Sequence, residues 1–283
     1  MNAVMEGFQR NADAVASHAC EVVEHRWVND RYKYLKLMAG ADLAAATRAG
    51  QFYQLRCPVS DTLQPFLLRP MSVYGTGPEP GGIEFLYNVT GTGTRALANL
   101  VVGDVMDIVG PLGNTFTFRP AFRRILLVAR GVGLATMAPV VHLAARAGVA
   151  VVAVMSARAP QDLMRDEFLR GVSAEVHGLY DSDGSSEVAN VESLVRGLLD
   201  HQPFDAVYTC GSHRLLLLLQ RVLRDYPGVL GEVAMEQHMA CGMGVCLSCV
   251  RLFEVDGEKQ FLRVCREGPV FPIHDVVGEV RYG

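Results

Sequence analysis

Four cysteines near the end of the 283-residue sequence constrain the chain more than any other feature. Cys241, Cys246 and Cys249 are separated by four and then two residues, and Cys265 follows after another fifteen. This C-x4-C-x2-C…C spacing is typical of a plant-type [2Fe–2S] cluster, whose irons are held by four thiolates. The spacing therefore predicts a cluster on these cysteines, and a protein that moves electrons.

Two other interpretations of these cysteines stay open, namely a structural zinc ion and uncoordinated thiols. Zinc sites usually pair two C-x2-C units, whereas this tail contains a single one. Gly242 and Gly244 lie inside the loop, where glycine permits unusual dihedral angles and lets backbone N–H groups approach sulfur. These glycines favour the cluster. A disulfide framework suits small secreted chains, and this chain is neither small nor visibly secreted.

Composition excludes some classes of function. Hydrophobic residues make up 50% of the chain and charged residues 20%, as in a globular protein with a sizeable core. The net charge of -4 gives no reason to expect a nucleic-acid partner. No apolar run approaches the roughly 20 residues that span a bilayer, so we expect no membrane segment and a cytoplasmic location. Residues 1–18 are expected to form a flexible or weakly helical extension without an apolar signal region.

Residues 19–119 have the pattern of an antiparallel barrel. Short β-rich stretches alternate with turns that are rich in Gly, Pro and Asp. The predicted strands are Cys20–Val28, Tyr32–Met38, Gln51–Cys57, Phe66–Tyr74, Ile83–Val89 and Val105–Val109. A single helix is predicted over 94–100. Strands at this spacing favour a closed antiparallel sheet.

Residues 120–229 instead alternate between apolar strands and helices. The predicted strands are Arg124–Ala129, Val149–Met155, Glu175–Leu179 and Ala206–Thr209. The first predicted helix follows the strand Arg124–Ala129 and ends near Ala147. The other predicted helices cover Asp162–Leu169, Val191–Leu199 and Arg214–Arg224. This alternation predicts a doubly wound parallel sheet with helices on both faces. The tail, residues 230–283, is too small to hold a core unaided and is predicted to form a separate cluster domain.

The tail also carries a resemblance to a known family. Glu236–Val250 and Val264–Phe271 resemble the corresponding segments of the electron-transfer subunit of dihydroorotate dehydrogenase B. That family belongs to the ferredoxin-reductase superfamily. The resemblance extends from about Cys20 to the end of the chain, and it implies a flavin-binding barrel, a nucleotide-binding domain and a C-terminal [2Fe–2S] domain.

The barrel contains residues that resemble the family's FAD site. Arg69, Pro70, Met71 and Ser72 match the motif Arg-Pro-x-Ser, in which arginine offers a cation to the FAD pyrophosphate and serine reaches N5 of the flavin. Other residues implied to bind FAD are Leu86, Tyr87 and Asn88, followed by Gly93 and Thr94 in Gly-x-Gly-Thr, while Gly110–Phe116 resembles the segment that closes the barrel. The family usually has Arg or Lys in place of Asn88, so weaker phosphate binding is expected there.

The second domain contains a glycine-rich loop between its first strand and first helix. Gly131 and Gly133 are implied to bind NAD, although Arg130 and Thr136 replace the family's usual glycine and proline. The further residues implied to contact NAD are Arg158 and Cys210, the latter in Cys-Gly-Ser where the family has Cys-Gly-Pro. The sequence leaves open whether Arg130 grips a phosphate or obstructs the nicotinamide. No carboxylate closes the second strand, so NAD is favoured by the resemblance alone.

The resemblance implies an oxidoreductase subunit with FAD, a [2Fe–2S] cluster and NAD as cofactors. In the family, electrons from dihydroorotate oxidised at an FMN in a partner catalytic subunit pass through the cluster and FAD to NAD, within a heterotetramer. No residue of this chain is then catalytic toward dihydroorotate. The alternatives are a flavin and iron–sulfur subunit of a hydrogenase, a sulfide dehydrogenase or an oxygenase reductase system, and a non-enzymatic zinc-stapled binding module.

Overall fold

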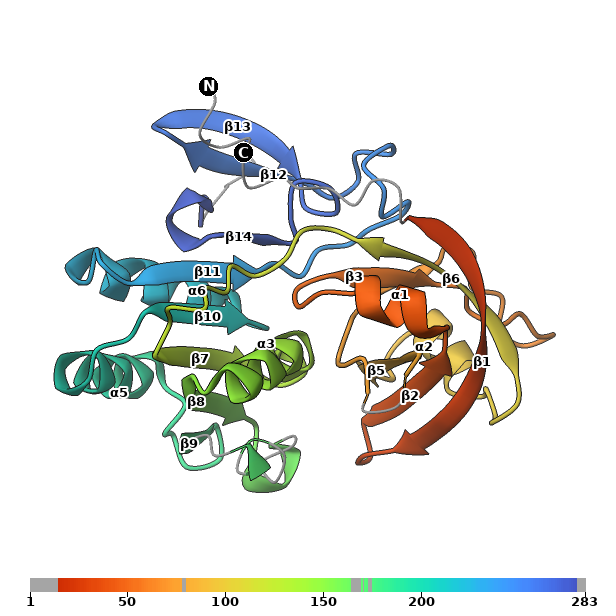
Figure 1. The fold of residues 1–283 in the computed structure, drawn as a ribbon, viewed down its shortest axis with the longest axis horizontal. Helices are drawn as coiled ribbons and strands as arrows, with labels where there is room; N and C mark the ends of the chain where they lie inside the picture. The colour runs from red at the N-terminus through yellow and green to blue at the C-terminus, as the bar shows by residue number, and fades with distance from the viewer. Residues whose placement is uncertain (1–14, 78–79, 164–168, 170, 173–174, 279–283) are drawn as a thin grey trace. The chain divides into compact units, whose positions relative to one another are not determined.

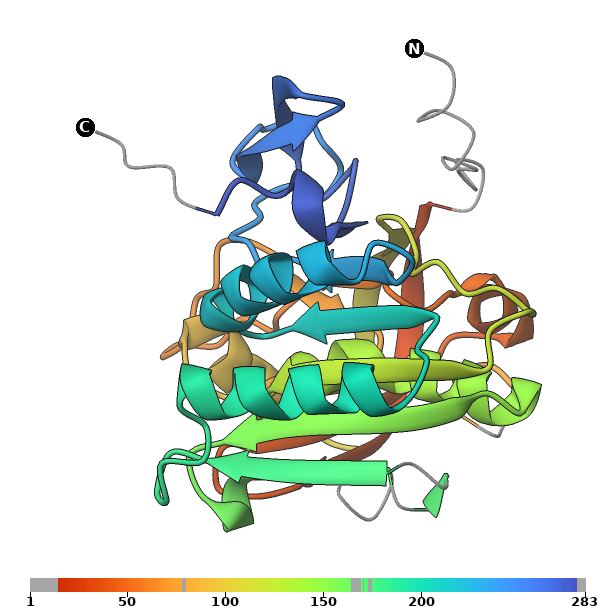
Figure 2. The ribbon, with the colours of Figure 1, turned by 90° about the vertical axis from the view of Figure 1, so that its left-hand side faces the viewer.

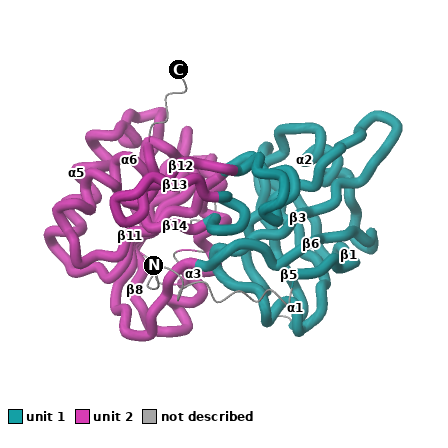
Figure 3. The backbone as a smooth tube through the Cα atoms, turned by 90° about the horizontal axis from the view of Figure 1, so that it is seen from above, with its two compact units in different colours: residues 1–115, 237–249, 263–269 teal, residues 116–236, 250–262, 270–283 magenta. Residues whose placement is uncertain are grey.

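A computed structural model describes residues 15–77, 80–163, 169, 171–172 and 175–278 of the chain. The chain divides into two compact units, each assembled from segments that are far apart in the sequence (Figure 3). The first unit comprises residues 1–115, 237–249 and 263–269, and the second comprises residues 116–236, 250–262 and 270–283. Parts of the cysteine-bearing tail therefore belong to each unit. The three-domain division with boundaries at residues 119 and 229 stays a prediction.

The described part of the first unit contains an antiparallel sheet with strand order β4-β3-β6-β1-β2-β5 (Figure 1). Its strands are β1 (Ala16–Trp27), β2 (Tyr32–Met38), β3 (Phe52–Leu55), β4 (Arg69–Ser72), β5 (Gly82–Asn88) and β6 (Val105–Leu112). An antiparallel bridge between Gly75 and Glu84 joins the segment after β4 to β5, and the Glu84 N–H donates to the Gly75 carbonyl at 2.8 Å. The bridge nearly closes the sheet, which confirms the predicted antiparallel barrel.

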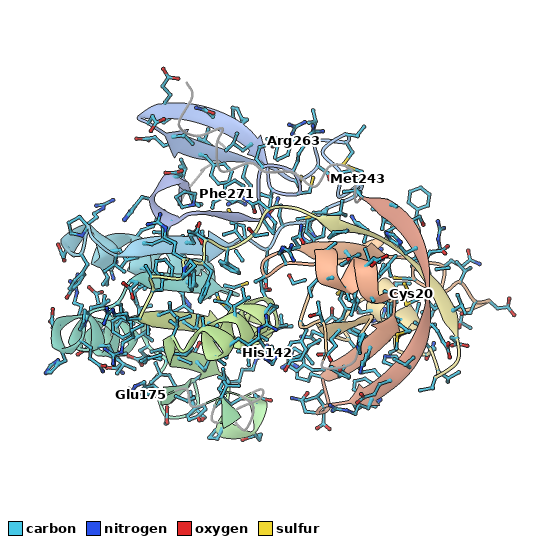
Figure 4. The ribbon with its side chains drawn as sticks, viewed as in Figure 1. Cys20, His142, Glu175, Met243, Arg263 and Phe271 are labelled. Atoms are coloured by element: carbon cyan, nitrogen blue, oxygen red, sulfur yellow. The ribbon has the colours of Figure 1, made fainter. Side chains whose placement is uncertain are left out.

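Alternating apolar side chains fill the barrel. Leu35, Tyr53, Ile83, Phe85 and Ile108 are fully buried in one cluster. Period-2 alternation brings such residues to one face of each strand, so the sheet curls around a continuous core. Cys20 also lies in this core (Figure 4), where burial raises the pKa of its thiol to about 11. This cysteine is therefore a small apolar core residue.

Two short helices accompany the barrel. Helix α2 (Thr92–Leu97) begins two residues before the predicted range of 94–100. Helix α1 (Ala41–Ala46) was not predicted. Its six residues are too few to show a 3.6-residue apolar period, and the tertiary packing of Leu43 and Ala44 stabilises it instead.

The described part of the second unit contains a sheet with strand order β14-β11-β10-β7-β8-β9. Its strands are β7 (Arg124–Arg130), β8 (Ala150–Ala157), β9 (Glu175–Tyr180), β10 (Ala206–Cys210), β11 (Leu230–Ala234) and β14 (Val270–Pro272). All neighbouring strands pair in parallel except β14, which runs antiparallel to β11. This sheet confirms the predicted parallel fold. Its fifth parallel strand, β11, follows directly after residue 229.

Helices cover both faces of this sheet, as the doubly wound pattern requires. Figure 2 shows α3 on the face opposite α5 and α6. The helices are α3 (Gly133–Ala147), α5 (Val188–His201) and α6 (His213–Val222), with 3-10 turns η2 (Pro160–Asp162) and η3 (Leu223–Asp225). Most of the helix predicted over 162–169 lies outside the described residues. No helix in the described ranges is long and apolar enough to cross a membrane.

The remaining elements of the tail pack on the parallel sheet. They are the hairpin β12 (Val250–Val255) and β13 (Glu258–Arg263) and the 3-10 turn η4 (Ile273–Asp275). The rings of Phe253 and Phe271 lie 4.2 Å apart between centroids. The Gln220 side chain on α6 donates hydrogen bonds to the carbonyls of Ile273 and Val276 at 2.7 and 2.6 Å. These contacts hold the described part of the tail on the parallel sheet, since so short a segment cannot fold alone.

Candidate functional site

The four predicted cluster ligands lie in the first unit and form two pairs. The Sγ atoms of Cys249 and Cys265 are 3.2 Å apart, well beyond the length of about 2.05 Å of a disulfide bond. Cys241 and Cys246 contact each other reciprocally, since the N–H of each donates to the Sγ of the other at 3.5 Å. The four predicted thiols thus lie in two contacting pairs, Cys241 with Cys246 and Cys249 with Cys265.

The loop that carries three of these thiols turns its own backbone toward the sulfur atoms. The N–H groups of Met243 and Val245 each donate to Cys241 Sγ at 3.4 Å. Gly242 and Gly244 have φ values of 71° and 84°, in the left-handed region that glycine adopts without strain. Leu247 has a φ of 61°, which is rare for a residue with a side chain and typical of functional loops. N–H donors aimed at thiolates stabilise their negative charge.

The two pairs of thiols differ in their surroundings. Cys249 and Cys265 are buried, and burial raises the pKa of Cys265 to about 12. Cys246 is exposed, and hydrogen bonding to Ser248 lowers the pKa of its thiol to about 6. A metal ion deprotonates a thiol that ligates it, and the positive charge of the ion then stabilises the buried thiolate.

An ion pair behind the cysteines holds the loop. The Arg263 guanidinium binds the Glu267 carboxylate at 2.5 and 3.0 Å and also donates to the Gly244 carbonyl at 3.1 Å. Figure 4 shows Arg263 and Met243 on neighbouring parts of the cysteine-bearing segment. The Asn114 side chain, at the end of the barrel, donates to the Glu267 carbonyl at 3.0 Å. These contacts hold the loop in the first unit, although the loop has no hydrophobic core of its own.

The donor set fits a two-iron cluster. No group of three or more His, Cys, Asp or Glu side chains among the described residues converges on the position of a single metal ion. Two thiol pairs instead provide two ligands for each of two metal ions, as in a [2Fe–2S] cluster. A structural zinc site needs four donors around one ion. Two pairs of thiols are the donor set that a two-iron cluster needs.

The predicted FAD residues lie on β4, β5 and α2 of the same unit. Arg69 begins β4, and its guanidinium covers the first turn of α2 so closely that a Cβ atom on Gly93 would overlap it. The Thr94 hydroxyl accepts hydrogen bonds from the N–H groups of Thr90 and Gly91 at 2.9 and 3.1 Å. A cation and a glycine-rich helical turn thus lie side by side, which is the arrangement expected for a pyrophosphate group.

The other predicted FAD residues occupy two kinds of position. Pro70, Met71 and Ser72 are half-buried on β4, and Asn88 is half-buried at the end of β5. Leu86 and Tyr87 are buried, and the Tyr87 hydroxyl forms a hydrogen bond of 2.8 Å with His25. Tyr87 belongs to the barrel core, whereas Leu86, its neighbour on the strand, does not and projects to the opposite face. The contacts of both residues with FAD stay predictions.

In the second unit, the loops after β7 and β10 touch backbone to backbone. A Cβ atom on Gly133 would lie 2.5 Å from the Cys210 carbonyl oxygen, and one on Gly211 would overlap the Arg130 carbonyl oxygen. Both positions therefore require glycine. β7 and β10 are neighbours whose connections leave in opposite directions, which makes this the topological switch point where doubly wound sheets bind ligands.

Cys210 lies beside a cavity of about 660 Å³ at the carboxyl ends of β10 and β11. Burial raises the pKa of its thiol to about 12, and Thr136 forms a hydrogen bond with it. Glu236 lines the same cavity, and burial raises the pKa of its carboxyl above the ordinary value. Sequence reasoning passed over Glu236 because its one signal is a carboxylate two residues after a buried strand. Cys210 thus forms part of the wall of this cavity, and its contact with NAD stays a prediction.

Arg130 is bound by a carboxylate. Its guanidinium donates to both oxygens of Asp181 at 3.1 and 2.6 Å, and the Ser186 hydroxyl also donates to Asp181. Hydrogen bonding to Arg130 lowers the pKa of Asp181 to about 2, so this carboxylate is ionised at neutral pH. Nothing in the sequence near either residue indicated this pair. Arg158 is exposed next to it.

The Arg130–Asp181 pair crosses the end of β8. Arg130 ends β7 and Asp181 follows β9, and β8 lies between these strands. Neighbouring strands are about 4.8 Å apart, so the pair spans about 10 Å across the carboxyl end of the middle strand. The Asp181 N–H also donates to the Ala157 carbonyl at 3.1 Å. A carboxylate therefore does lie beside the end of β8, the second parallel strand. It is Asp181, which follows β9, the third parallel strand.

Comparisons with known proteins agree with this arrangement. The family model for the iron-sulfur cluster binding domain of dihydroorotate dehydrogenase B matches residues 236–277. The chain is 31% identical over 238 residues to the electron transfer subunit of dihydroorotate dehydrogenase B (NAD(+)) from Desulforamulus reducens, covering 84% of this chain and 90% of that protein. Identity to the subunit of the same name from Streptococcus pneumoniae serotype 4 is 33%, covering 86% and 94%.

Solved structures show the same fold. The structure of an NADH-dependent reduced ferredoxin-NADP oxidoreductase, studied for flavin-based electron bifurcation, superposes with a TM-score of 0.74 at 27% identity, covering 91% of this chain and 89% of that one. The ferredoxin-NADP+ reductase of Plasmodium falciparum superposes with a TM-score of 0.60 at 12% identity, covering 77% and 96%. The chain belongs to the family of electron transfer subunits of dihydroorotate dehydrogenase B.

The paired thiols generate a prediction about metal content. The purified chain should contain about two irons and two acid-labile sulfides per molecule and show the broad visible absorption of a [2Fe–2S] cluster. Cys249→Ser should abolish most of this absorption, because it removes half of the buried pair, while Cys20→Ser, in the barrel core, should leave iron content per folded molecule unchanged. Elemental analysis and absorption spectra provide the measurement. A colourless protein with stoichiometric zinc would contradict the cluster.

Proposed function

We propose that this chain is the electron-transfer subunit of a dihydroorotate dehydrogenase of the B type. It passes electrons from an FMN-containing catalytic subunit through a [2Fe–2S] cluster and FAD to NAD, in pyrimidine biosynthesis. The observation that carries the proposal is the pairing of the four thiols within the same compact unit as the Arg69–Gly93 contact. Membership of the family supports it, and a cytoplasmic location is part of it.

Each cofactor has residues suited to hold it. Cys241 and Cys246 would bind one iron, and Cys249 and Cys265 the other. For FAD, Arg69 would bind the pyrophosphate and Ser72 would reach the flavin ring. When bound, the flavin exchanges either one or two electrons and so connects a one-electron cluster with the two-electron carrier NAD. The contribution of the chain is to bind and orient these groups.

The surface around the cluster loop supports a protein partner. Met243, Val245 and Leu247 alternate with the glycines and cysteines of the loop, and their exposed fractions are 43%, 78% and 58%. Apolar side chains that gather on a surface typically mark an interface. We propose that the FMN subunit binds here and that two copies of each subunit form a heterotetramer. Electrons would then enter at the exposed side of the cluster.

A second candidate is a flavin and iron–sulfur subunit of another redox complex. It is supported by the similarity to the NADH-dependent reduced ferredoxin-NADP oxidoreductase structure, at 27% identity over 91% of this chain. The modules are the same in both proposals. The difference between them lies in the protein that contacts the cluster loop.

Reconstitution of the complex tests the function. The chain is co-expressed with an FMN-containing dihydroorotate dehydrogenase subunit, and the purified complex is assayed for NADH formation from dihydroorotate and NAD. We expect NADH formation by the complex and none by this chain alone, because the oxidising site belongs to the partner. Stable association with a hydrogenase or ferredoxin-dependent partner instead, without turnover of dihydroorotate, would favour the second candidate.

Replacement of Arg69 tests the flavin site. Arg69→Ala removes the cation beside Gly93 and should weaken FAD binding by about 10-fold or more, since charge-assisted bonds to phosphate are worth about 1.5–3 kcal/mol. Iron content should stay unchanged. FAD release is measured by flavin fluorescence after dilution. Arg95→Ala serves as the control, because Arg95 lies on the same helix as Gly93 and its guanidinium donates to the Thr90 carbonyl instead. Equal FAD retention in both variants would contradict the assignment.

Replacement of Asp181 tests the choice between NAD and NADP. An acidic residue at the end of the second strand typically accepts a hydrogen bond from the ribose 2′-hydroxyl and repels a 2′-phosphate. Asp181→Asn should therefore lower the preference for NADH over NADPH by about 10-fold, through the loss of one negative charge. Dissociation constants of the full chain for both nucleotides provide the measurement. Asp183→Asn, on the same turn, is the control, and the Asp181 assignment is wrong if both variants keep the wild-type ratio.

A further inference from the structure

Gln54 on β3 is a buried polar residue that the FAD and cluster assignments leave without a role. Its side chain is completely buried. Its neighbours Tyr53 and Leu55 belong to the barrel core, and Gln54 does not. Because successive side chains on a strand point to opposite faces, Gln54 lies on the outer face of the barrel. Something outside the barrel core must therefore cover it.

The cluster loop provides this cover. Gln54 Nε2 donates to the Ala240 carbonyl at 3.3 Å. The same side chain fills the space beside Gly242, where an added Cβ atom would lie 2.7 Å from Gln54 Cγ. Ala240 and Gly242 are the residues on either side of the ligand Cys241. One barrel side chain thus contacts the backbone of the cluster loop both before and after a cluster ligand.

The opposite neighbour of Gln54 belongs to the flavin motif. In the β3–β4 ladder, Gln54 pairs with Pro70 and Phe52 pairs with Ser72. Directly opposite residues in an antiparallel pair project to the same face of the sheet. Gln54 therefore shares a face with Pro70 and with Ser72, the residue predicted to reach the flavin ring. It lies between the flavin strand and the cluster loop, within one compact unit.

The second polar atom of the amide is unusual. Gln54 Oε1 is buried and accepts no hydrogen bond from any residue that the structure describes. Buried amide oxygens almost always have a partner, so an exception calls for an explanation. A leucine or methionine in this position would fill the same space without an unpaired acceptor. The polar side chain is thus retained at a cost, beside two predicted redox groups.

We propose that Gln54 is a positioning residue for electron transfer between the cluster and the flavin. Its amide fixes the Cys241 side of the cluster loop against the strand that carries the flavin motif, and it supplies a dipole beside the cluster. This inference rests on the proposed function, because it concerns the passage of electrons between these two groups. Groups that hydrogen-bond around a metal site, without ligating it, orient its ligands and tune its electronic properties.

Three variants of the full chain test the inference. Gln54→Met keeps the volume and removes the amide. Gln54→Glu keeps the shape, and its carboxyl can donate to the Ala240 carbonyl only when protonated. Gln51→Met is the matched control, because Gln51 lies next to the same strand and its amide contacts Arg48 and Gly113 instead. Iron, sulfide and FAD contents are measured first, and then NADH-driven reduction of the cluster is followed by rapid mixing.

The expected results separate positioning from structural support. Gln54→Met should retain both cofactors, reduce its cluster about 10-fold more slowly and show an altered electron paramagnetic resonance spectrum of the reduced cluster. Gln54→Glu should be slow at neutral pH and recover as the pH falls and its carboxyl becomes a donor. Gln51→Met should match the wild type in rate and spectrum at every pH.

Other outcomes would overturn the inference. A wild-type rate and spectrum in Gln54→Met would show that the amide is dispensable. A rate that falls only in proportion to lost iron or FAD would show that Gln54 merely supports the fold. These results differ from a failure of the proposed function, in which the wild-type chain itself would lack iron, flavin or NADH-driven cluster reduction.

Discussion

The need to hold four thiols within reach of two metal ions governs how the end of this chain is built. Thiolates repel one another, and a loop that gathers them has no room for an apolar core. The chain meets this constraint with backbone N–H groups directed at Cys241 and with left-handed dihedral angles at Gly242 and Gly244. The Arg263–Glu267 ion pair then ties the loop from behind. Polar contacts thus stabilise this loop, whereas hydrophobic packing stabilises the barrel and the parallel sheet.

The same constraint explains why the tail belongs to two compact units. Residues 237–249 and 263–269 group with the barrel, whereas the hairpin between them and the last strand group with the parallel sheet. The segments that carry the predicted ligands are anchored by Gln54 and Asn114 of the barrel. The segments without ligands bury apolar side chains such as Phe253 and Phe271. Polar contacts thus join the cysteine-bearing segments to the barrel, and hydrophobic burial joins the hairpin and the last strand to the parallel sheet.

Local patterns in the sequence were sufficient for most of the fold. Short β-rich stretches between turns rich in Gly, Pro and Asp predicted the barrel strands, and β2 has the predicted bounds Tyr32–Met38. Cysteine spacing predicted four ligands, and the structure places these thiols in two pairs. Contacts between distant segments left no such signal. Nothing near Gln54 indicates that Ala240 covers it, and nothing near Arg130 indicates a partner fifty-one residues away. Helix α1 was missed because six residues show no period.

Departures from the family pattern around the nucleotide loop are each balanced by a local contact. Arg130 replaces a glycine, and Asp181 neutralises its charge. Thr136 replaces a proline, and it forms a hydrogen bond with the buried Cys210 thiol. Ser212 replaces another proline, and its hydroxyl accepts the Leu215 N–H at 3.4 Å to cap α6. Gly133 and Gly211, where the backbones touch, are unchanged. Arg130 and Thr136 are accommodated at this switch point because each has a partner for its polar side chain. The backbone contacts at Gly133 and Gly211, in contrast, leave no room for a Cβ atom, so these two positions fix the geometry of the loop.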